Sequence, residues 1–313
     1  MELYKSRGFS AFFQDTFAFI KENGKHFFRE YFIVNGIFLL VLAVLGYFFT
    51  KFYSEFIFGG VLNNKSTSVF DDYINDNLVL FLAMFVVFML VALVAGVVSY
   101  AFPFIYLKLY SHKGGTHFET RDILNSYKEN VGKLVTYILC FMAIAIPMLI
   151  VFLIGAFILA ITIVGIMALP LLGGAFMLFY GMTLMEYLEG KKSVWDCFSY
   201  AFDLIKLKFW AAVGSVGMFY FIVYIIQNII SIIPYVFGMA SVFTTVQEGS
   251  SNSDDLGSTM TIVMLFVFFL TFFTGTVLGN VVQLNQGIVF YSLKEEKENI
   301  KTKSVIDQIG SGE

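Results

Sequence analysis

The sequence predicts an all-α fold: a polytopic membrane helix bundle with six transmembrane helices. Of its 313 residues, 58% are hydrophobic and only 14% are charged, whereas soluble domains carry roughly 25% charged residues. A soluble protein of this length could not bury so much apolar surface. Six apolar segments are each long enough to cross ~30 Å of hydrocarbon, which takes about 20 helical residues. Successive loops between these segments are alternately rich and poor in Lys and Arg, which also indicates a chain that crosses the membrane repeatedly.

The six apolar segments follow one another within a single membrane domain over residues 1–292. We expect the spans at about 32–50, 78–107, 134–155, 158–185, 209–234 and 259–282. The stretch from Leu134 to Met185 has no Asp, Glu, Lys or Arg and is too long for one helix. We therefore divide it at Gly155, where a tight turn is allowed. Residues 293–313 form a polar cytoplasmic tail.

Lys and Arg fall on one side of the predicted spans. Eighteen of the 20 lie in the residues up to Tyr31, in 108–133, in 186–208 or from Lys294 onward. The other two lie in the loop after the first span. Because cytoplasmic loops carry the excess of positive charge, we expect both the N and C termini to be cytoplasmic.

Three amphipathic segments precede spans on the cytoplasmic side, at about 9–22, 119–131 and 194–206. We expect each to form a helix that lies at the membrane interface. Trp195 and Trp210 are the only tryptophans, and they lie near the same boundary, where membrane proteins concentrate aromatic side chains.

The ends and faces of these three segments follow the rules for helix termini and periodicity. Gly24 would end the first segment. Thr116 with Glu119, and Ser193 with Asp196, have the spacing of capping boxes before the second and third. The predicted apolar stripes are Phe9, Phe12, Phe13, Phe17 and Ile20; Ile123, Leu124, Tyr127 and Val131; and Trp195, Phe198, Phe202 and Ile205.

The three segments also suggest an internal repeat. Phe17-Ala-Phe-Ile-Lys21 and Phe202-Asp-Leu-Ile-Lys206 are alike in detail, whereas the middle segment matches only in pattern. One interpretation is three diverged units, each an interfacial helix followed by a transmembrane hairpin. The alternative is that any cytoplasmic loop between hairpins is amphipathic because it lies against headgroups.

All four prolines lie inside apolar segments and are candidate kinks: Pro103, Pro147, Pro170 and Pro234. Broken helices at mid-membrane can mark the substrate site of a transporter. The alternative is a simple kink, which neighbouring helices accommodate. No Asp, Glu, Lys, Arg or His lies in the core of any predicted span, which argues against a proton-driven pump.

The last span carries small and amide side chains toward its cytoplasmic end. Gly275 and Gly279 form a G-x-x-x-G step that allows close helix packing. The amides after it should lie near the cytoplasmic end of the second span. These side chains predict an amide-lined pocket for a lipid headgroup or a partner peptide, or else hydrogen bonds that fix the bundle. The residues are Asn280, Gln283, Asn285, Gln286, Ser99 and Tyr100.

Signatures of catalysis are missing from the sequence. It contains no G-x-S-x-G, H-E-x-x-H, Walker or kinase motif, so we predict no enzymatic activity and no cofactor. His112 and His117 flank two glycines in a loop near Glu119 and Asp122, but a metal site needs four ligands held in a rigid frame, and we do not expect this loop to supply one. The net charge of −3 and the absence of a basic, aromatic stripe give no reason to expect nucleic acid.

Two segments carry a resemblance to known proteins. They are Ser193-Val-Trp-Asp-Cys-Phe-Ser-Tyr-Ala-Phe-Asp-Leu-Ile-Lys206, which enters a span at Phe209-Trp210, and Asn285-Gln-Gly-Ile-Val-Phe-Tyr-Ser-Leu-Lys294. The chain resembles uncharacterised six-helix bacterial inner-membrane proteins that are similar to the membrane domain of glycerophosphoryl diester phosphodiesterases. The resemblance implies a membrane module in the bacterial inner (plasma) membrane. The catalytic domain of those phosphodiesterases is missing, because only a short polar tail follows Lys294.

We therefore expect a non-enzymatic membrane module that organises a partner protein or membrane lipids at the cytoplasmic face. The alternative function is a transporter or flippase for a lipid or a small hydrophobic molecule, suggested by Pro147, Pro170 and the amide cluster.

Overall fold

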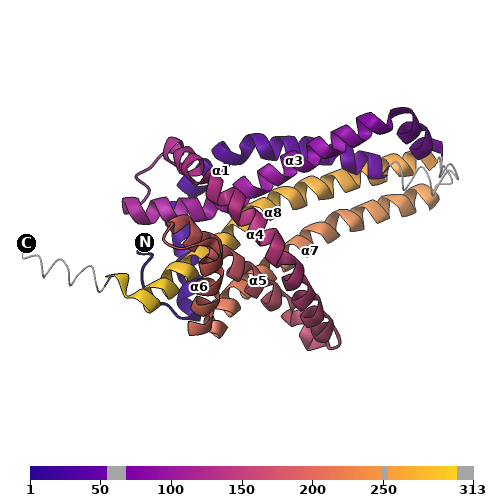
Figure 1. Cartoon of the computed structure of the whole chain (residues 1–313). Helices are drawn as coiled ribbons and strands as arrows, with labels where there is room; N and C mark the ends of the chain where they lie inside the picture. Colours follow the sequence, from indigo (N-terminus) through magenta and orange to yellow (C-terminus); the bar gives the residue numbers. More distant parts are fainter. Residues whose placement is uncertain (55–67, 248–252, 302–313) are drawn as a thin grey trace, which may run out of the picture. The chain divides into compact units, whose positions relative to one another are not determined.

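The computed structural model describes residues 1–54, 68–247 and 253–301, and these form seven α-helices (Figure 1). Six of the helices are long and apolar enough to cross a membrane. The predicted all-α fold with six spans is therefore confirmed. The helices are α1 (Phe9–Ser54), α3 (Ser68–Lys113), α4 (Thr120–Ala160), α5 (Ile163–Glu189), α6 (Val194–Leu207), α7 (Phe209–Gln247) and α8 (Ser253–Glu298).

The chain divides into two compact units, where we had expected one membrane domain. Unit 1 consists of Met1–Val34, Ser99–Ile222 and Gly279–Glu313, and unit 2 consists of Asn35–Val98 and Val223–Leu278. Helices α4, α5 and α6 belong entirely to unit 1. Helices α1, α3, α7 and α8 each contribute one part to each unit.

Helix α1 is a single helix of 46 residues, so the prediction that Gly24 ends an interfacial helix is wrong. Phe12 and Phe19 are buried, and Phe27 and Tyr31 continue the same buried face beyond Gly24. The Phe27 ring lies 4.9 Å from the Tyr106 ring of α3. Burial of this continuous face outweighs the roughly 1 kcal/mol that a glycine costs inside a helix.

Helix α4 also joins an amphipathic segment to a span without a break. The predicted cap at Thr116 is wrong, because the helix begins at Thr120 and the Asp122 carboxylate accepts a hydrogen bond (3.0 Å) from the backbone N–H of Glu119. Its predicted stripe is only half right: Ile123 and Tyr127 are buried, whereas Leu124 and Val131 are exposed.

Helix α6 is the amphipathic segment that forms a separate helix. Its predicted cap is confirmed: the Ser193 hydroxyl accepts a hydrogen bond (3.2 Å) from the backbone N–H of Asp196 and donates one (2.7 Å) to the Asp196 carboxylate. The chain leaves helical geometry at Lys208 before α7 begins. Only one of the three segments is thus a distinct helix, and the threefold repeat stays a prediction.

The turn between α4 and α5 lies at Thr162, and not at Gly155 as predicted. The Thr162 side chain accepts a hydrogen bond (2.9 Å) from the backbone N–H of Gly165. Any side chain at Gly165 would collide with the Leu159 carbonyl. Gly155 instead lies within α4, where a Cβ would be 3.2 Å from the Leu172 side chain of α5. The tight turn therefore depends on Gly165, and the two helices form a long hairpin (Figure 1).

The helices run through the candidate kinks without unwinding. Pro103 lies inside α3, Pro147 inside α4 and Pro170 inside α5, and the bounds of α7 include Pro234. The residues around each proline are helical. The half-helices expected for a discontinuous transporter span are not found at these positions.

The two glycines of the predicted G-x-x-x-G step of α8 have different surroundings. A Cβ at Gly275 would lie 2.8 Å from the side-chain nitrogen of Gln227, so Gly275 makes room for a side chain. The neighbouring Asn228 donates to the carbonyl of Tyr224 in its own helix (2.8 Å). A Cβ at Gly279, which belongs to unit 1, would meet no atom within 4 Å.

Candidate functional site

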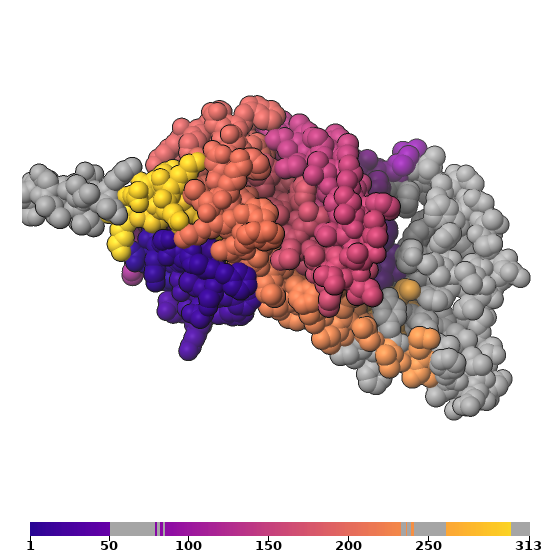
Figure 2. All heavy atoms as spheres, turned by 90° about the horizontal axis from the view of Figure 1, so that it is seen from below, coloured from indigo at the N-terminus to yellow at the C-terminus, as the bar shows by residue number. Residues whose placement is uncertain are grey.

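Four segments rich in Lys and Arg meet within unit 1. The Lys208 ammonium donates to the Ser6 hydroxyl (3.0 Å), and Lys108 donates to the Leu188 carbonyl (2.5 Å). The Ser6 hydroxyl also donates to Glu296 (3.0 Å). Figure 2 shows the end of α8 (yellow) between the N-terminal segment (indigo) and the region of α6 (salmon). The predicted alternation of charge therefore corresponds to segments that lie together in space.

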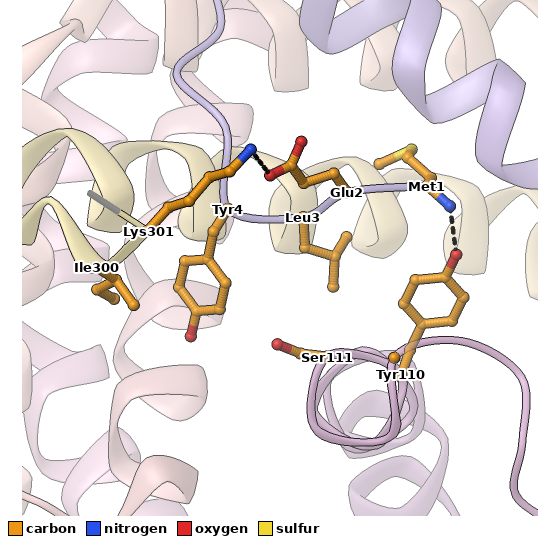
Figure 3. A pocket seen from close by; sticks show the side chains of 9 residues that line it. Met1, Glu2, Leu3, Tyr4, Tyr110, Ser111, Ile300 and Lys301 are labelled. Carbon is orange, nitrogen blue, oxygen red and sulfur yellow. Dashed lines mark hydrogen bonds and ion pairs between the residues drawn. The ribbon is translucent and has the colours of Figure 1, made fainter. Parts of the chain in front are cut away.

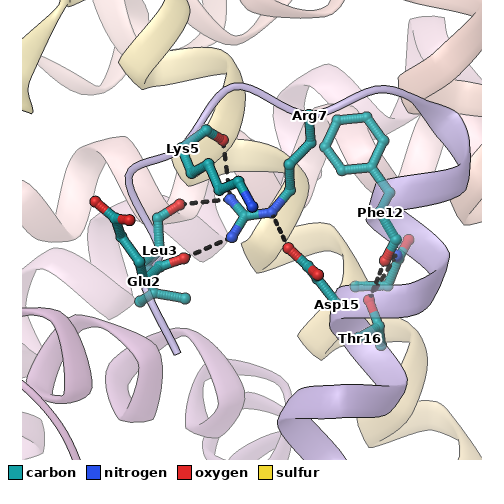
Figure 4. Close-up of polar contacts among 8 residues, drawn as sticks. Glu2, Leu3, Lys5, Arg7, Phe12, Asp15 and Thr16 are labelled. Atoms are coloured by element: carbon teal, nitrogen blue, oxygen red, sulfur yellow. Dashed lines mark hydrogen bonds and ion pairs between the residues drawn. The ribbon is translucent and has the colours of Figure 1, made fainter.

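The N-terminal segment is folded around one buried guanidinium (Figure 4). Arg7 donates to the carbonyls of Glu2 (2.5 Å), Leu3 (2.7 Å) and Lys5 (2.9 Å). Its Nε lies 2.7 Å from the Asp15 carboxylate at the start of α1. A charged group with no partner would be costly at this depth, and these four acceptors satisfy it. Sequence analysis did not identify Arg7.

A buried ion pair links the end of α5 to α8. The Lys294 ammonium lies 2.7 Å from one Glu186 oxygen, and the Lys192 ammonium lies 2.6 Å from the other. The Glu186 and Lys294 side chains are each only 1% exposed. Because two lysines share the Glu186 carboxylate, each buried charge of this cluster has a partner.

Tyr200 of α6 extends this cluster toward the surface. The Lys192 ammonium lies 3.3 Å from the centre of the Tyr200 ring, and the Lys297 ammonium lies 4.3 Å from it, both in cation–π geometry. The Tyr200 hydroxyl hydrogen bonds to Glu298. Burial, together with the Glu298 carboxylate, raises the pKa of Tyr200 well above its ordinary value. The cluster therefore fixes α6 against the end of α8.

The amide side chains of α8 separate into different environments. Asn285 is fully buried, and its amide nitrogen donates to Thr16 (2.9 Å) and to Ser215 (3.1 Å). It therefore ties α8 to α1 and α7, which supports the interpretation of Asn285 as a bundle-fixing residue. Asn280 is also buried, whereas Gln283 is half-exposed.

Gln286 and Tyr100 lie near a common neighbour. A Cβ at Gly181 would be 2.6 Å from the Gln286 side-chain oxygen and 3.1 Å from the Phe104 ring. The Tyr100 ring packs on Phe104 as well, with centroids 5.5 Å apart. Asn285 instead bonds to Thr16 and Ser215. The amide-lined pocket stays a prediction.

A cavity of about 380 Å³ lies at the N-terminal segment (Figure 3). Met1 donates from its amine to the Tyr110 hydroxyl (2.6 Å), and Glu2 forms an ion pair with Lys301. A hydrogen bond from Lys301 lowers the pKa of Glu2. Burial raises the pKa of Tyr4. The cavity is lined by Met1, Glu2, Leu3, Tyr4, Tyr110, Ser111, Gly114, Ile300 and Lys301.

An apolar cavity of about 260 Å³ lies between α4, α5 and α7. It is lined by Ala145, Met148, Leu149, Phe152, Gly173, Phe176, Met177, Tyr180 and Tyr220. All of these residues belong to unit 1. Only the two tyrosines carry polar side-chain atoms, so the cavity suits an apolar ligand.

The four apolar residues of α6 that were predicted to share one face lie on a buried face and an exposed face. Phe198 and Ile205 are buried, whereas Trp195 and Phe202 are exposed. The exposed side chains recur at positions 195, 199, 202 and 206, and we call this stripe (Trp195, Ser199, Phe202 and Lys206) the α6 aromatic face. The Lys206 ammonium lies 4.0 Å from the centre of the Phe202 ring.

Trp195 is 58% exposed, and Trp210 at the start of α7 is 82% exposed. Trp195 is the second residue of α6 and Trp210 is the second residue of α7, and both present their rings outward. Because exposed indole rings concentrate at membrane boundaries, the α6 aromatic face and Trp210 are the candidate functional site.

The three histidines do not converge. His26 contacts the Tyr106 hydroxyl (2.8 Å) and the Phe118 carbonyl (3.1 Å), and so joins α1 to the segment before α4. Sequence analysis did not single out this histidine. Within residues 1–54, 68–247 and 253–301, no group of three or more His, Cys, Asp or Glu residues could hold a metal ion.

No known protein family, curated protein or solved structure matches the chain. The resemblance to bacterial inner-membrane proteins therefore stays a prediction.

Proposed function

We propose that this chain is a non-enzymatic integral membrane module that organises lipids at the cytoplasmic face of the membrane, in the bacterial inner membrane that the family resemblance implies. The observation that carries the proposal is the α6 aromatic face. Exposed Trp195 and Trp210 suit the boundary between headgroups and acyl chains, where indole rings concentrate. Lys206 on the same face adds a positive charge next to Phe202.

The surroundings of α6 support a lipid role. Where the four basic segments meet in unit 1, exposed lysines such as Lys206 form part of a surface that would lie at the headgroups, and a cation there attracts anionic lipid. The polar groups buried near this surface already have partners within the protein. Arg7 donates to backbone carbonyls, Asn285 hydrogen bonds to Thr16 and Ser215, and Glu186 forms ion pairs with two lysines. These contacts favour a structural role for them over catalysis. A partner protein on the same face is the competing outcome of the test below.

A transporter or flippase for a lipid or small hydrophobic molecule is the second candidate function. The apolar cavity between α4, α5 and α7 favours it. The continuous helices at Pro147 and Pro170 weigh against a mechanism that uses broken helices. Changing both prolines to alanine separates the candidates, because transport through a gated span would be lost while a lipid-organising surface would stay intact.

The two tryptophans allow a direct test of the lipid proposal. The full chain is reconstituted in vesicles that contain equal mole fractions of phosphatidylglycerol and phosphatidylcholine, with bromine atoms on the acyl chains of one of the two. Bromine quenches indole fluorescence at short range. We expect stronger quenching when phosphatidylglycerol carries the bromine, because the anionic lipid is enriched at the α6 aromatic face.

Two charge variants control this experiment. Lys206→Gln should reduce the difference between the two brominated lipids, whereas Lys25→Gln, an exposed lysine on α1, should preserve it. Equal quenching by both lipids in the unaltered protein would overturn the proposal. Protection of the tryptophans from both lipids would instead indicate a protein partner or a second copy on this face.

A further inference from the structure

The apolar cavity between α4, α5 and α7 has the features of a binding site. Its rim is exposed at Leu149 and Met177, and its wall contains the Phe152 and Phe176 rings, whose centroids are 5.3 Å apart. All three helices that form it are long and apolar enough to cross a membrane. The medium at the exposed rim of such a cavity is lipid, so a chain from the bilayer can enter without crossing water.

One wall of the cavity carries a polar group without a partner. Tyr180 lines the cavity and is only 6% exposed. Among the described residues its hydroxyl has no hydrogen-bond partner. Buried hydroxyls normally have one, so this donor on a cavity-lining residue is open to an acceptor that the protein does not supply.

We propose that this cavity binds a single acyl chain whose ester or carboxyl oxygen accepts a hydrogen bond from Tyr180. The volume of about 260 Å³ lies slightly below the roughly 300–1,000 Å³ of typical small-molecule sites, which suits one chain better than a whole two-chain lipid. Among the other lining side chains, only Tyr220 carries a hydroxyl. The source of the chain is a free fatty acid or a membrane phospholipid, and the experiment distinguishes the two.

Gly173 offers a variant that closes the cavity without disturbing the fold. It lines the cavity, and a Cβ built on it would meet no atom within 4 Å. Gly173→Phe therefore has room for its ring inside the cavity, and it also removes a glycine from the interior of α5. Gly132→Phe is the matched control, because Gly132 of α4 is exposed and its Cβ would also meet nothing within 4 Å.

The test is photolabelling of the full chain in lipid nanodiscs. One arm uses a fatty acid with a diazirine on its chain, and the other uses a phospholipid with the same group. The labelled residues are identified by mass spectrometry of peptides. We expect labels on Phe176, Met177 and Leu149 in the unaltered protein and in Gly132→Phe, and loss of these labels to background in Gly173→Phe. The arm with the stronger label identifies the source.

Tyr180→Phe tests the hydrogen bond. An excess of unlabelled fatty acid should compete with the label, and we expect this competition to be roughly fivefold weaker in the variant. Competition by hexadecane, which has no oxygen, should be the same in both proteins. Equal competition by fatty acid in both proteins would remove Tyr180 from the proposal.

Labels spread evenly over exposed α4 residues such as Ile146 and Ile150, or unchanged labels in Gly173→Phe, would overturn the site itself. Both would mean ordinary contact with the bilayer. The proposal is independent of the α6 aromatic face, because tryptophan quenching reports on α6 and α7 near Trp210 and photolabelling reports on the cavity. Each can fail without the other.

Discussion

Lys294 and Glu186 form an ion pair of 2.7 Å in which both side chains are only 1% exposed. The pair joins the end of α8 to the end of α5, across 108 residues of sequence. Lys192 holds the other oxygen of Glu186 at 2.6 Å and is 31% exposed. The two cations are thus unequal, because Lys294 depends on Glu186 for its charge partner whereas Glu186 has a second lysine.

Because the two lysines are unequal, substitutions in this cluster should lower the free energy of unfolding by different amounts. Glu186→Met strands the buried Lys294, and we expect it to lower the free energy of unfolding by about 3–5 kcal/mol. Lys294→Met leaves Glu186 paired with Lys192 and should cost less. The double variant should be more stable than Glu186→Met alone. Unfolding in mixed detergent micelles measures all three, and a larger loss in Lys294→Met than in Glu186→Met would contradict the assigned pairing.

Arg7 should be needed to hold the N-terminal segment. Arg7→Ala removes the donors to the Glu2, Leu3 and Lys5 carbonyls, and we expect a loss of roughly 3 kcal/mol, because hydrogen bonds to charged groups are the stronger ones. Lys5→Ala is the control, since only its backbone oxygen contacts Arg7. Hydrogen exchange at residues 3–8 should become fast in Arg7→Ala alone. Equal exchange in the two variants would show that the segment does not depend on the guanidinium.

Two adjacent glycines of α5 should respond in opposite ways. A Cβ at Gly174 would lie 2.8 Å from the backbone of Gly217 in α7, whereas a Cβ at Gly173 would meet nothing within 4 Å. Gly174→Ala forces the two helices apart and should cost about 1–3 kcal/mol. Gly173→Ala should be neutral or stabilising. Thermal unfolding of the two variants decides, and equal effects would contradict the close crossing of α5 and α7.

Cys197 should react with alkylating reagents only at high pH. It is fully buried in α6, and burial raises the pKa of its thiol to about 11. Since the thiolate is the reactive form, the rate of alkylation should rise about tenfold per pH unit until the pH approaches that value. Mass spectrometry follows the reaction in a Cys140→Ser background, with protein unfolded in SDS as the reference.

The same shift has a consequence for stability. The folded-state pKa lies above the ordinary thiol value of about 8.5, so folding favours the neutral thiol. This contribution is complete below the unfolded pKa and is lost as the pH rises toward 11. Rapid alkylation of the folded protein at pH 7 would mean that the thiol is accessible and that α6 does not pack as described.

Hydropathy and charge were sufficient to predict six spans and the segments that lie together, because both depend on composition over about 20 residues. The helix ends were harder. Gly24 has the sequence features of a helix end, but burial of Phe27 and Tyr31 beyond it keeps α1 helical. The turn was placed at Gly155, because the Thr162 cap and the crowding at Gly165 that set it are not visible as a local glycine signal.

The candidate site was predictable only in part. Ser193 and the tryptophans are local signals and were identified. The ion pair of Glu186 with Lys294 and the acceptors around Arg7 depend on chain segments that meet only in the fold, so no spacing pattern marks them. The two apolar faces of α6 could not be separated either, because a helical stripe does not tell which side the rest of the protein covers.

The most direct test of the central claim is to extract the full chain with its native lipids in polymer discs and to identify by mass spectrometry everything that co-purifies. The claim predicts enrichment of anionic lipid over the bulk membrane, and loss of that enrichment in Lys206→Gln but not in Lys25→Gln. A stoichiometric protein partner together with a bulk lipid composition would contradict it, and would indicate that the α6 aromatic face binds protein.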